Sequence, residues 1–153
     1  MFSSSQDIYQ HIASQMVQSI QEPNWTTSWL VIFSNYGSET IRIKTGFYSN
    51  NDPNTVKAFD PFHCVNHGLG KATSKLYELM KEDSEDKPFN KYKFILNNDG
   101  TFDVEFKYDQ DYEYIFSIHP DSEEYDSIEV KDMRAIKSWE GLPKDHPRPW
   151  LHQ

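Results

Sequence analysis

The spacing of apolar residues near the N-terminus predicts a helix. Apolar side chains recur every four residues from Ile8 to Ile20, so they fall on one face of a helix. A run of serines before this stretch offers N-cap oxygens, and Pro23 follows where a helix has to stop. We therefore expect a helix over residues 5–21.

The period of the pattern then changes from four to two. Apolar and polar residues alternate over residues 25–48 on both sides of the turn-forming stretch NYGSE, which predicts a β-hairpin. Residues 55–60 follow as a short third strand. Residues 63–81 carry apolar positions at helical spacing and predict a second helix, although Gly68 and Gly70 weaken its first half by about 1 kcal/mol each.

The second half of the chain begins with a charged stretch, residues 81–88, which we interpret as an exposed linker. Alternation predicts a strand at residues 91–96, a further strand after a tight turn, and another at residues 112–118. A last helix is expected over residues 127–139, with Ser127 as its N-cap.

Apolar residues occupy every second position on both strands of the second hairpin, and this spacing predicts the length of the turn between them. A three-residue loop at residues 98–100 places Leu96 opposite Phe102, so the apolar rows of both strands share one face. A two-residue loop would break both faces. Gly100 then occupies the left-handed position that such loops require.

The strand after this turn separates apolar from acidic side chains. Its expected buried row consists of Phe102, Val104, Phe106 and Tyr108. On the opposite face the predicted register sets Lys93 across from Glu105, so part of the acidic charge is neutralised within the sheet.

The order of helices and strands indicates the α+β class. We expect an antiparallel β-sheet of four to six strands with two or three helices packed mainly on one face. A chain of 153 residues favours a single domain over residues 1–153. Its end, residues 141–153, is rich in proline and is expected to be irregular, with Trp150 either packed against the body or exposed for a partner.

The negative net charge of the chain limits the kinds of molecule that it is expected to bind. The chain has 24 acidic residues against 15 Lys and Arg and a net charge of -9, which disfavours direct contact with nucleic acid or anionic membranes. No apolar segment is long enough to span a membrane, and the first residues lack the pattern of a signal peptide, so we expect a cytoplasmic protein. The single cysteine, Cys64, excludes an internal disulfide.

Motifs for catalysis or metal binding are weak. The stretch GLGKAT lacks the spacing of a phosphate-binding loop. His63 and His67 would share a helix face, which allows a metal site, but two surface histidines explain the spacing as well. Cys64 lies beside His63, which allows a thiol nucleophile, but a buried structural cysteine explains it as well. The acids of DQDYE lack the glycine and the closing glutamate of a calcium loop. We therefore expect no catalytic residue, metal or cofactor.

The acidic residues between positions 99 and 132 have two interpretations. These residues include half the acids of the protein, and they either form a solvated face or a docking surface for a basic protein, with aromatic side chains as anchors. The partner-binding residues that the second interpretation predicts are Asp103, Glu105, Asp109, Asp111, Tyr112, Glu113, Glu123, Glu124, Tyr125, Asp126 and Glu129. Sequence alone does not separate aromatic residues of the core from those of an interface.

The layout resembles a known family. A helix, DIYQHIASQMVQSI, that ends in Pro-x-Trp, and a later hairpin, YKFILNNDGTFDVEFKYD, resemble the YezG-like family of bacterial immunity proteins over residues 7–33 and 92–109. The resemblance implies a small acidic α+β protein that neutralises a cognate toxin, often a nuclease, in the polymorphic toxin systems of competing bacteria.

Three functions follow as hypotheses. The leading one is a monomeric immunity protein, not an enzyme, that inhibits a basic nuclease toxin by occupying its phosphate-binding groove with carboxylates. The alternative is an acidic secretion chaperone or adaptor that holds an effector segment on its sheet edge or on a helix face. A small enzyme is the third, and a metal bound at His63 and His67 would favour it.

Overall fold

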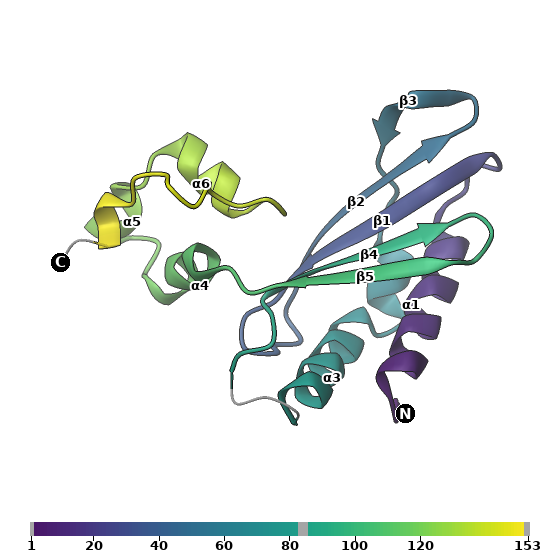
Figure 1. Ribbon diagram of the computed structural model, residues 1–153, viewed down its shortest axis with the longest axis horizontal. Helices are drawn as coiled ribbons and strands as arrows, with labels where there is room; N and C mark the ends of the chain where they lie inside the picture. The colour runs from purple at the N-terminus through teal and green to yellow at the C-terminus, as the bar shows by residue number, and fades with distance from the viewer. Residues whose placement is uncertain (1, 83–85, 152–153) are drawn as a thin grey trace. The chain divides into compact units, whose positions relative to one another are not determined.

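The chain forms two compact units. The computed structural model describes residues 2–82 and 86–151, and contacts group the chain into unit 1, Met1–Tyr108, and unit 2, Asp109–Gln153 (Figure 1). The sequence predicted one domain over residues 1–153, and the structure divides this length in two.

Unit 1 holds one antiparallel sheet of five strands in the order β3-β2-β1-β4-β5, which confirms the α+β class (Figure 1). That the helices pack mainly on one face of this sheet stays a prediction. The elements of unit 1 are α1 (Ser5–Ser19), β1 (Trp25–Phe33), β2 (Arg42–Ser49), β3 (Asp52–Lys57), α2 (Phe62–Asn66), α3 (Leu69–Glu82), β4 (Lys91–Asn97) and β5 (Phe102–Lys107).

Helix α1 forms where the four-residue spacing predicts it. The side chain of Ser4 caps its start by accepting the backbone N–H of Asp7 at 3.2 Å. Ile8, Ile12 and Met16 are its buried residues. The helix ends at Ser19, two residues before the predicted end.

The hydrophobic core of unit 1 joins residues of the sheet with residues of its helices. Buried residues of α1 and α3 join those of β1, β2 and β4 in one cluster, and each fully buried Leu, Ile or Phe contributes about 1.5–3 kcal/mol. Tyr92 belongs to this cluster and is 0% exposed, and its hydroxyl lies 2.6 Å from Thr73 Oγ1. Burial raises the pKa of Tyr92, so its ring remains neutral.

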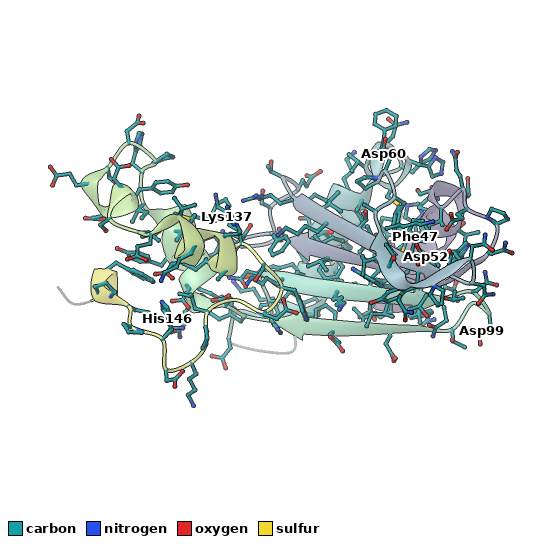
Figure 2. All side chains as sticks on the ribbon, turned by 90° about the horizontal axis from the view of Figure 1, so that it is seen from above. Phe47, Asp52, Asp60, Asp99, Lys137 and His146 are labelled. Carbon is teal, nitrogen blue, oxygen red and sulfur yellow. The ribbon has the colours of Figure 1, made fainter. Side chains whose placement is uncertain are left out.

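The second hairpin has the predicted register. Leu96 pairs with Phe102, and Gly100 has a φ of 92° in the three-residue loop. The carboxylate of Asp99, labelled at the tip of this hairpin in Figure 2, accepts the N–H of Thr101 at 3.0 Å. The expected burial of Tyr108 is wrong: its side chain follows the end of β5 and is 36% exposed.

Other predicted elements of unit 1 need correction. The helix expected over residues 63–81 is two helices, because the chain turns at Gly68, which has a φ of 90°. The third strand begins at Asp52 and ends at Lys57, earlier than predicted. The predicted linker at 81–88 includes residues 83–85, which lie outside the described residues.

Unit 2 is helical throughout its regular part. It contains α4 (Gln110–Ser117), α5 (Glu123–Asp126), α6 (Val130–Ile136) and the 3-10 turn η1 (Pro149–Leu151).

The strand predicted at residues 112–118 is wrong, since these residues belong to α4. The carboxylate of Asp109 accepts the backbone N–H groups of Asp111 and Tyr112 and so starts a helix at the point where the alternating pattern would continue a strand. Tyr112 and Ile115 then bury one face at helical spacing.

The last predicted helix is shorter than expected. Ser127 is the C-cap of α5, and its N–H donates to the Glu123 carbonyl at 2.9 Å, so it does not start the next helix. Helix α6 begins at Val130 and ends at Ile136.

The proline-rich tail is irregular up to the turn η1, as predicted. Trp150 is buried, with 6% of its surface exposed. Tyr114 donates its hydroxyl to the Trp150 carbonyl at 3.4 Å, so α4 and the tail are in contact. Among the residues that the structure describes, no helix has the length and apolar character to cross a membrane.

Candidate functional site

The acids predicted to bind a partner are divided between the two units. Asp103 and Glu105 lie on β5 of unit 1, on the face opposite the core, and both are exposed. The other predicted contact residues belong to unit 2. Each group is therefore described within its own unit.

Three of the predicted contact residues stabilise unit 2 instead. Asp109 caps α4 through the two backbone N–H groups described above. The carboxylate of Asp111 is an ion-pair partner of Arg148, with Nε to Oδ1 at 2.9 Å, and the residue is only 8% exposed. Tyr112 is 1% exposed, and its ring centroid lies 4.7 Å from that of Phe116. Burial removes Asp111 and Tyr112 from any contact surface, and Glu113 on the same helix is only partly exposed.

Within unit 2, the exposed acids of the predicted surface lie around α5. Ser122 caps this four-residue helix by accepting the N–H of Tyr125 at 3.2 Å, and the acids that follow it are exposed. Their negative charge at the start of the helix is favourable. The exposed acids of this region are Asp121, Glu123, Glu124, Asp126 and Glu129.

Next to these acids the surface of unit 2 is hollowed. We name this the α5–α6 hollow; it has a volume of about 380 Å³ and is lined by Tyr125, Asp126, Ile128, Val130, Met133, Arg134 and Lys137. Val130 is 74% exposed, whereas Ile128 is 6% exposed. The charged residues of the lining are Asp126, Arg134 and Lys137, so both signs of charge are present. An apolar hollow of this kind can take an apolar side chain of a partner.

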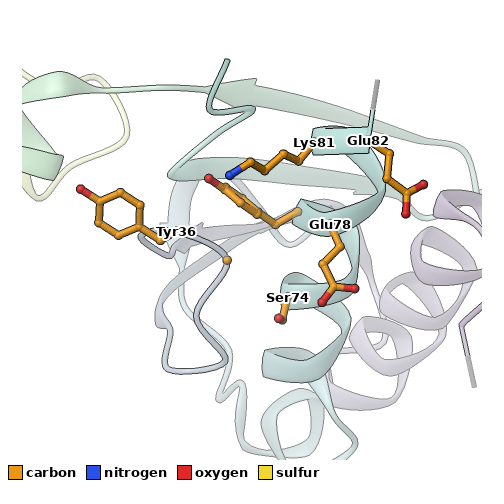
Figure 3. A pocket seen from close by; sticks show the side chains of 7 residues that line it. Tyr36, Ser74, Glu78, Lys81 and Glu82 are labelled. Atoms are coloured by element: carbon orange, nitrogen blue, oxygen red, sulfur yellow. The ribbon is translucent and has the colours of Figure 1, made fainter. Parts of the chain in front are cut away.

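A second hollow in unit 1 is more polar. It has a volume of about 450 Å³ and is lined by Tyr36, Gly37, Ser74, Tyr77, Glu78, Lys81 and Glu82 (Figure 3). Tyr36 has a φ of 57° and is 61% exposed, and the Lys87 ammonium lies 5.0 Å from the centroid of its ring. The Lys87 cation therefore already occupies one face of the Tyr36 ring.

The histidine pair does not form a metal site with its neighbours. The rings of His63 and His67 lie 4.0 Å apart, and His67 Nδ1 donates to the His63 carbonyl at 2.8 Å. His11 Nε2 donates to the His67 carbonyl at 2.8 Å. Within residues 2–82 and 86–151, no group of three or more His, Cys, Asp or Glu side chains has a geometry that could hold a metal ion.

Cys64 is a core residue. It is 1% exposed, and its Sγ lies 3.4 Å from Ser19 Oγ. Burial raises the pKa of the Cys64 thiol, so the thiolate needed for nucleophilic attack is disfavoured.

The outer face of the sheet carries lysine side chains, although the net charge of the chain is negative. The register places Lys44 and Lys93 on either side of Val31, on the face opposite the core. The Lys93 ammonium lies 5.6 Å from the Trp29 ring centroid. The alternation of Arg42 and Lys44 with apolar residues is the sequence signal for this face.

The residues of the α5–α6 hollow were also missed by the sequence interpretation, apart from Tyr125 and Asp126. Val130 and Met133 were absent from the predicted site because the expected helix over residues 127–139 did not reveal a turn between two short helices. The remaining signal is an isolated valine, Val130, within a charged stretch.

Comparisons with known proteins identify no family. No protein-family model matches the chain, and a search of curated proteins returned no match.

Proposed function

We propose that this protein is a cytoplasmic immunity protein that binds and neutralises a cognate bacterial toxin, with a basic nuclease as the favoured target. The observation that supports this proposal is the α5–α6 hollow, an apolar depression lined in part by Tyr125 and Asp126 of α5, a helix that also carries the exposed acids Glu123 and Glu124. The resemblance to YezG-like immunity proteins in the first helix and the second hairpin agrees with it.

The physical basis is complementarity of charge and shape. A nuclease holds phosphates with Lys and Arg, and carboxylates of an inhibitor can occupy the same side chains. Charge mainly accelerates association, while an apolar side chain placed in a dry hollow slows dissociation. Glu123 and Glu124 supply the first contribution, and Val130 and Met133 supply the second.

Inhibition by occupancy requires no catalytic residue on the inhibitor. We therefore propose a protein without enzymatic activity that acts in a one-to-one complex as a monomer. The cytoplasm is the compartment in which a nuclease toxin meets the nucleic acids of the cell.

The test is binding to the toxin domain encoded directly upstream of this chain, at low and at physiological salt. We expect the full chain to bind at low salt and to block nuclease activity. The double variant E123K/E124K should bind about tenfold more weakly or worse, and V130D should dissociate faster. The matched control is E39K/E82K, which makes the same charge change at exposed residues of unit 1.

Two results would contradict the proposal. One is no association of the wild-type chain with that domain at low salt. The other is equal binding by E123K/E124K and E39K/E82K, because the carboxylates of α5 would then have no part in the complex.

The alternative function, an acidic secretion chaperone or adaptor, is favoured by a different observation, the open edge of β5 in unit 1. An upstream gene for a secreted effector without toxic activity would support this alternative.

A further inference from the structure

The two edges of the sheet in unit 1 differ in how well they are protected. Edge strand β3 contains Pro53 and pairs with β2 through Phe47–Lys57 and Ser49–Asp52, with a register shift between these pairs. Proline and irregular pairing are features that prevent further strands from adding to an edge.

Strand β5 at the opposite edge has neither feature. Its sequence, FDVEFK, contains no proline or glycine, and its pairing with β4 is continuous from Lys91–Lys107 to Leu96–Phe102. A regular edge of this kind presents backbone groups to an additional strand.

The ladder shows which backbone groups these are. The carbonyls of Thr101 and Lys107 accept N–H groups of Asn97 and Asn90, so odd-numbered residues of this hairpin strand bond toward β4. Because alternate residues of an antiparallel strand bond to opposite sides, the even-numbered residues direct their N–H and C=O groups to the open side. These residues are Phe102, Val104 and Phe106.

The side chains on β5 define what would fit beside it. On the core side Phe102, Val104 and Phe106 are partly buried and pack against the core cluster. The ring of Phe102 lies 5.1 Å from that of Phe94 and 6.0 Å from that of Tyr9. The outer row consists of Asp103, Glu105 and Lys107; the two acids are exposed, and Glu105 lies opposite Lys93 of β4.

We propose that β5 binds an extended segment of a partner protein by strand addition, and that this segment alternates apolar residues with Lys or Arg. Its apolar side chains would continue the row of Phe102, Val104 and Phe106, and its cations would lie beside Asp103 and Glu105. A second copy of the chain, paired antiparallel with Val104 opposite Val104, would set Asp103 opposite Glu105, so like charges would meet. The inference does not depend on the proposed immunity function, since the partner need not be a toxin and the α5–α6 hollow takes no part. It shares the open edge of β5 with the alternative function, a chaperone or adaptor.

The probe for this test is the peptide acetyl-Lys-Val-Lys-Val-Lys-Val-Lys-amide, titrated into the full chain at low salt. We expect binding that slows amide hydrogen exchange at Phe102, Val104 and Phe106 but leaves the exchange of Asp103 and Glu105 unchanged. A peptide with the same charges and methylated backbone nitrogens on the bonding side should lose this protection.

Charge reversal provides the matched comparison. The variant D103K/E105K should bind the peptide about tenfold more weakly, whereas E123K/E124K, with the same change in net charge on unit 2, should bind it as the wild type does. Circular dichroism of both variants checks that each is folded.

Four results would overturn the inference. The first is no binding at low salt, and the second is equal binding of the methylated peptide. The third is an equal loss of affinity in E123K/E124K, which would indicate attraction by net charge alone. The fourth is protection of Val104 that grows with protein concentration without peptide, which would make a second copy the occupant.

Discussion

Arg148 binds the carboxylate of Asp111 with two of its nitrogen atoms. Nε lies 2.9 Å from Oδ1, and Nη2 lies 2.9 Å from Oδ2. The remaining donors bind carbonyls of the tail at Lys144, His146 and Pro143. This guanidinium therefore connects the tail to α4, and its hydrogen bonds to Asp111 raise the pKa of Arg148.

Replacement of Arg148 by methionine should loosen unit 2. The change leaves the carboxylate of Asp111, with a side chain 10% exposed, without its main partner. We expect a loss of about 1–2 kcal/mol in the free energy of unfolding, since both side chains keep some contact with water. Urea denaturation measures this loss. The control is R134M on exposed Arg134, and an equal effect of both changes would show that the ion pair contributes nothing.

Reversal of acids should separate structural from surface carboxylates. If Asp109, Asp111 and Glu113 belonged to a contact surface, as the sequence pattern predicts, the triple variant D109K/D111K/E113K would keep its melting temperature. The structure predicts the opposite, because the variant loses the cap of α4 and places a lysine beside Arg148, at a cost of about 3 kcal/mol. The triple variant E123K/E124K/E129K should melt within a few degrees of wild type. Differential scanning calorimetry measures the melting temperatures of both triple variants. Similar melting temperatures would contradict a structural role of Asp109 and Asp111.

The turn of the second hairpin should reject β-branched residues. Gly100 has a φ of 92°, and an added Cβ would meet no atom within 4 Å, so the cost of a substitution comes from the backbone alone. We expect G100V to lose about 1–2 kcal/mol of stability and G100N to lose less, since Asn tolerates positive φ. Chemical denaturation of the two variants measures the difference. Equal stability of G100V and wild type would rule out this strain.

Stability should fall at alkaline pH in part because of Cys64. Its folded-state pKa is raised by burial, so the unfolded thiol ionises first as the pH rises through about 8.5. The buried neutral thiol therefore makes its full contribution to the free energy of unfolding below about pH 8.5, and this contribution declines at higher pH. The midpoint of urea denaturation should therefore drop less between pH 8 and pH 10 in C64A than in wild type. An identical drop would contradict the shift.

The same residue should react slowly with thiol reagents in the native protein. Its 1% exposure and its raised pKa both reduce attack by the thiolate. Alkylation by iodoacetamide at pH 8 should become much faster in urea, and fast alkylation of the native chain would show that Cys64 is accessible.

The parts of the fold that the sequence predicts best are those fixed by local rules. The register of the second hairpin follows from parity and Gly100, and it is correct at each predicted pair. Helix α1 follows from spacing and a serine cap. In both cases the spacing of the apolar residues and a turn or cap residue indicate the same structure.

Prediction fails where two patterns fit the same residues. In YEYIFSI alternation and helical spacing coexist, and the cap by Asp109, which lies before the segment, decides for a helix. The ion pair between Asp111 and Arg148 joins residues far apart in sequence, so no local rule identifies it. The acidic surface was consequently predicted too large, with buried members among its exposed ones.

Every residue of the main core cluster precedes Lys107. The ribosome has therefore added the whole of that cluster before it begins unit 2. Compact units tend to fold in the order of their synthesis. Unit 1 can reach its native packing while the helices of unit 2 are still inside the exit tunnel. The edge of β5 is then the part of the surface of unit 1 that was synthesised last.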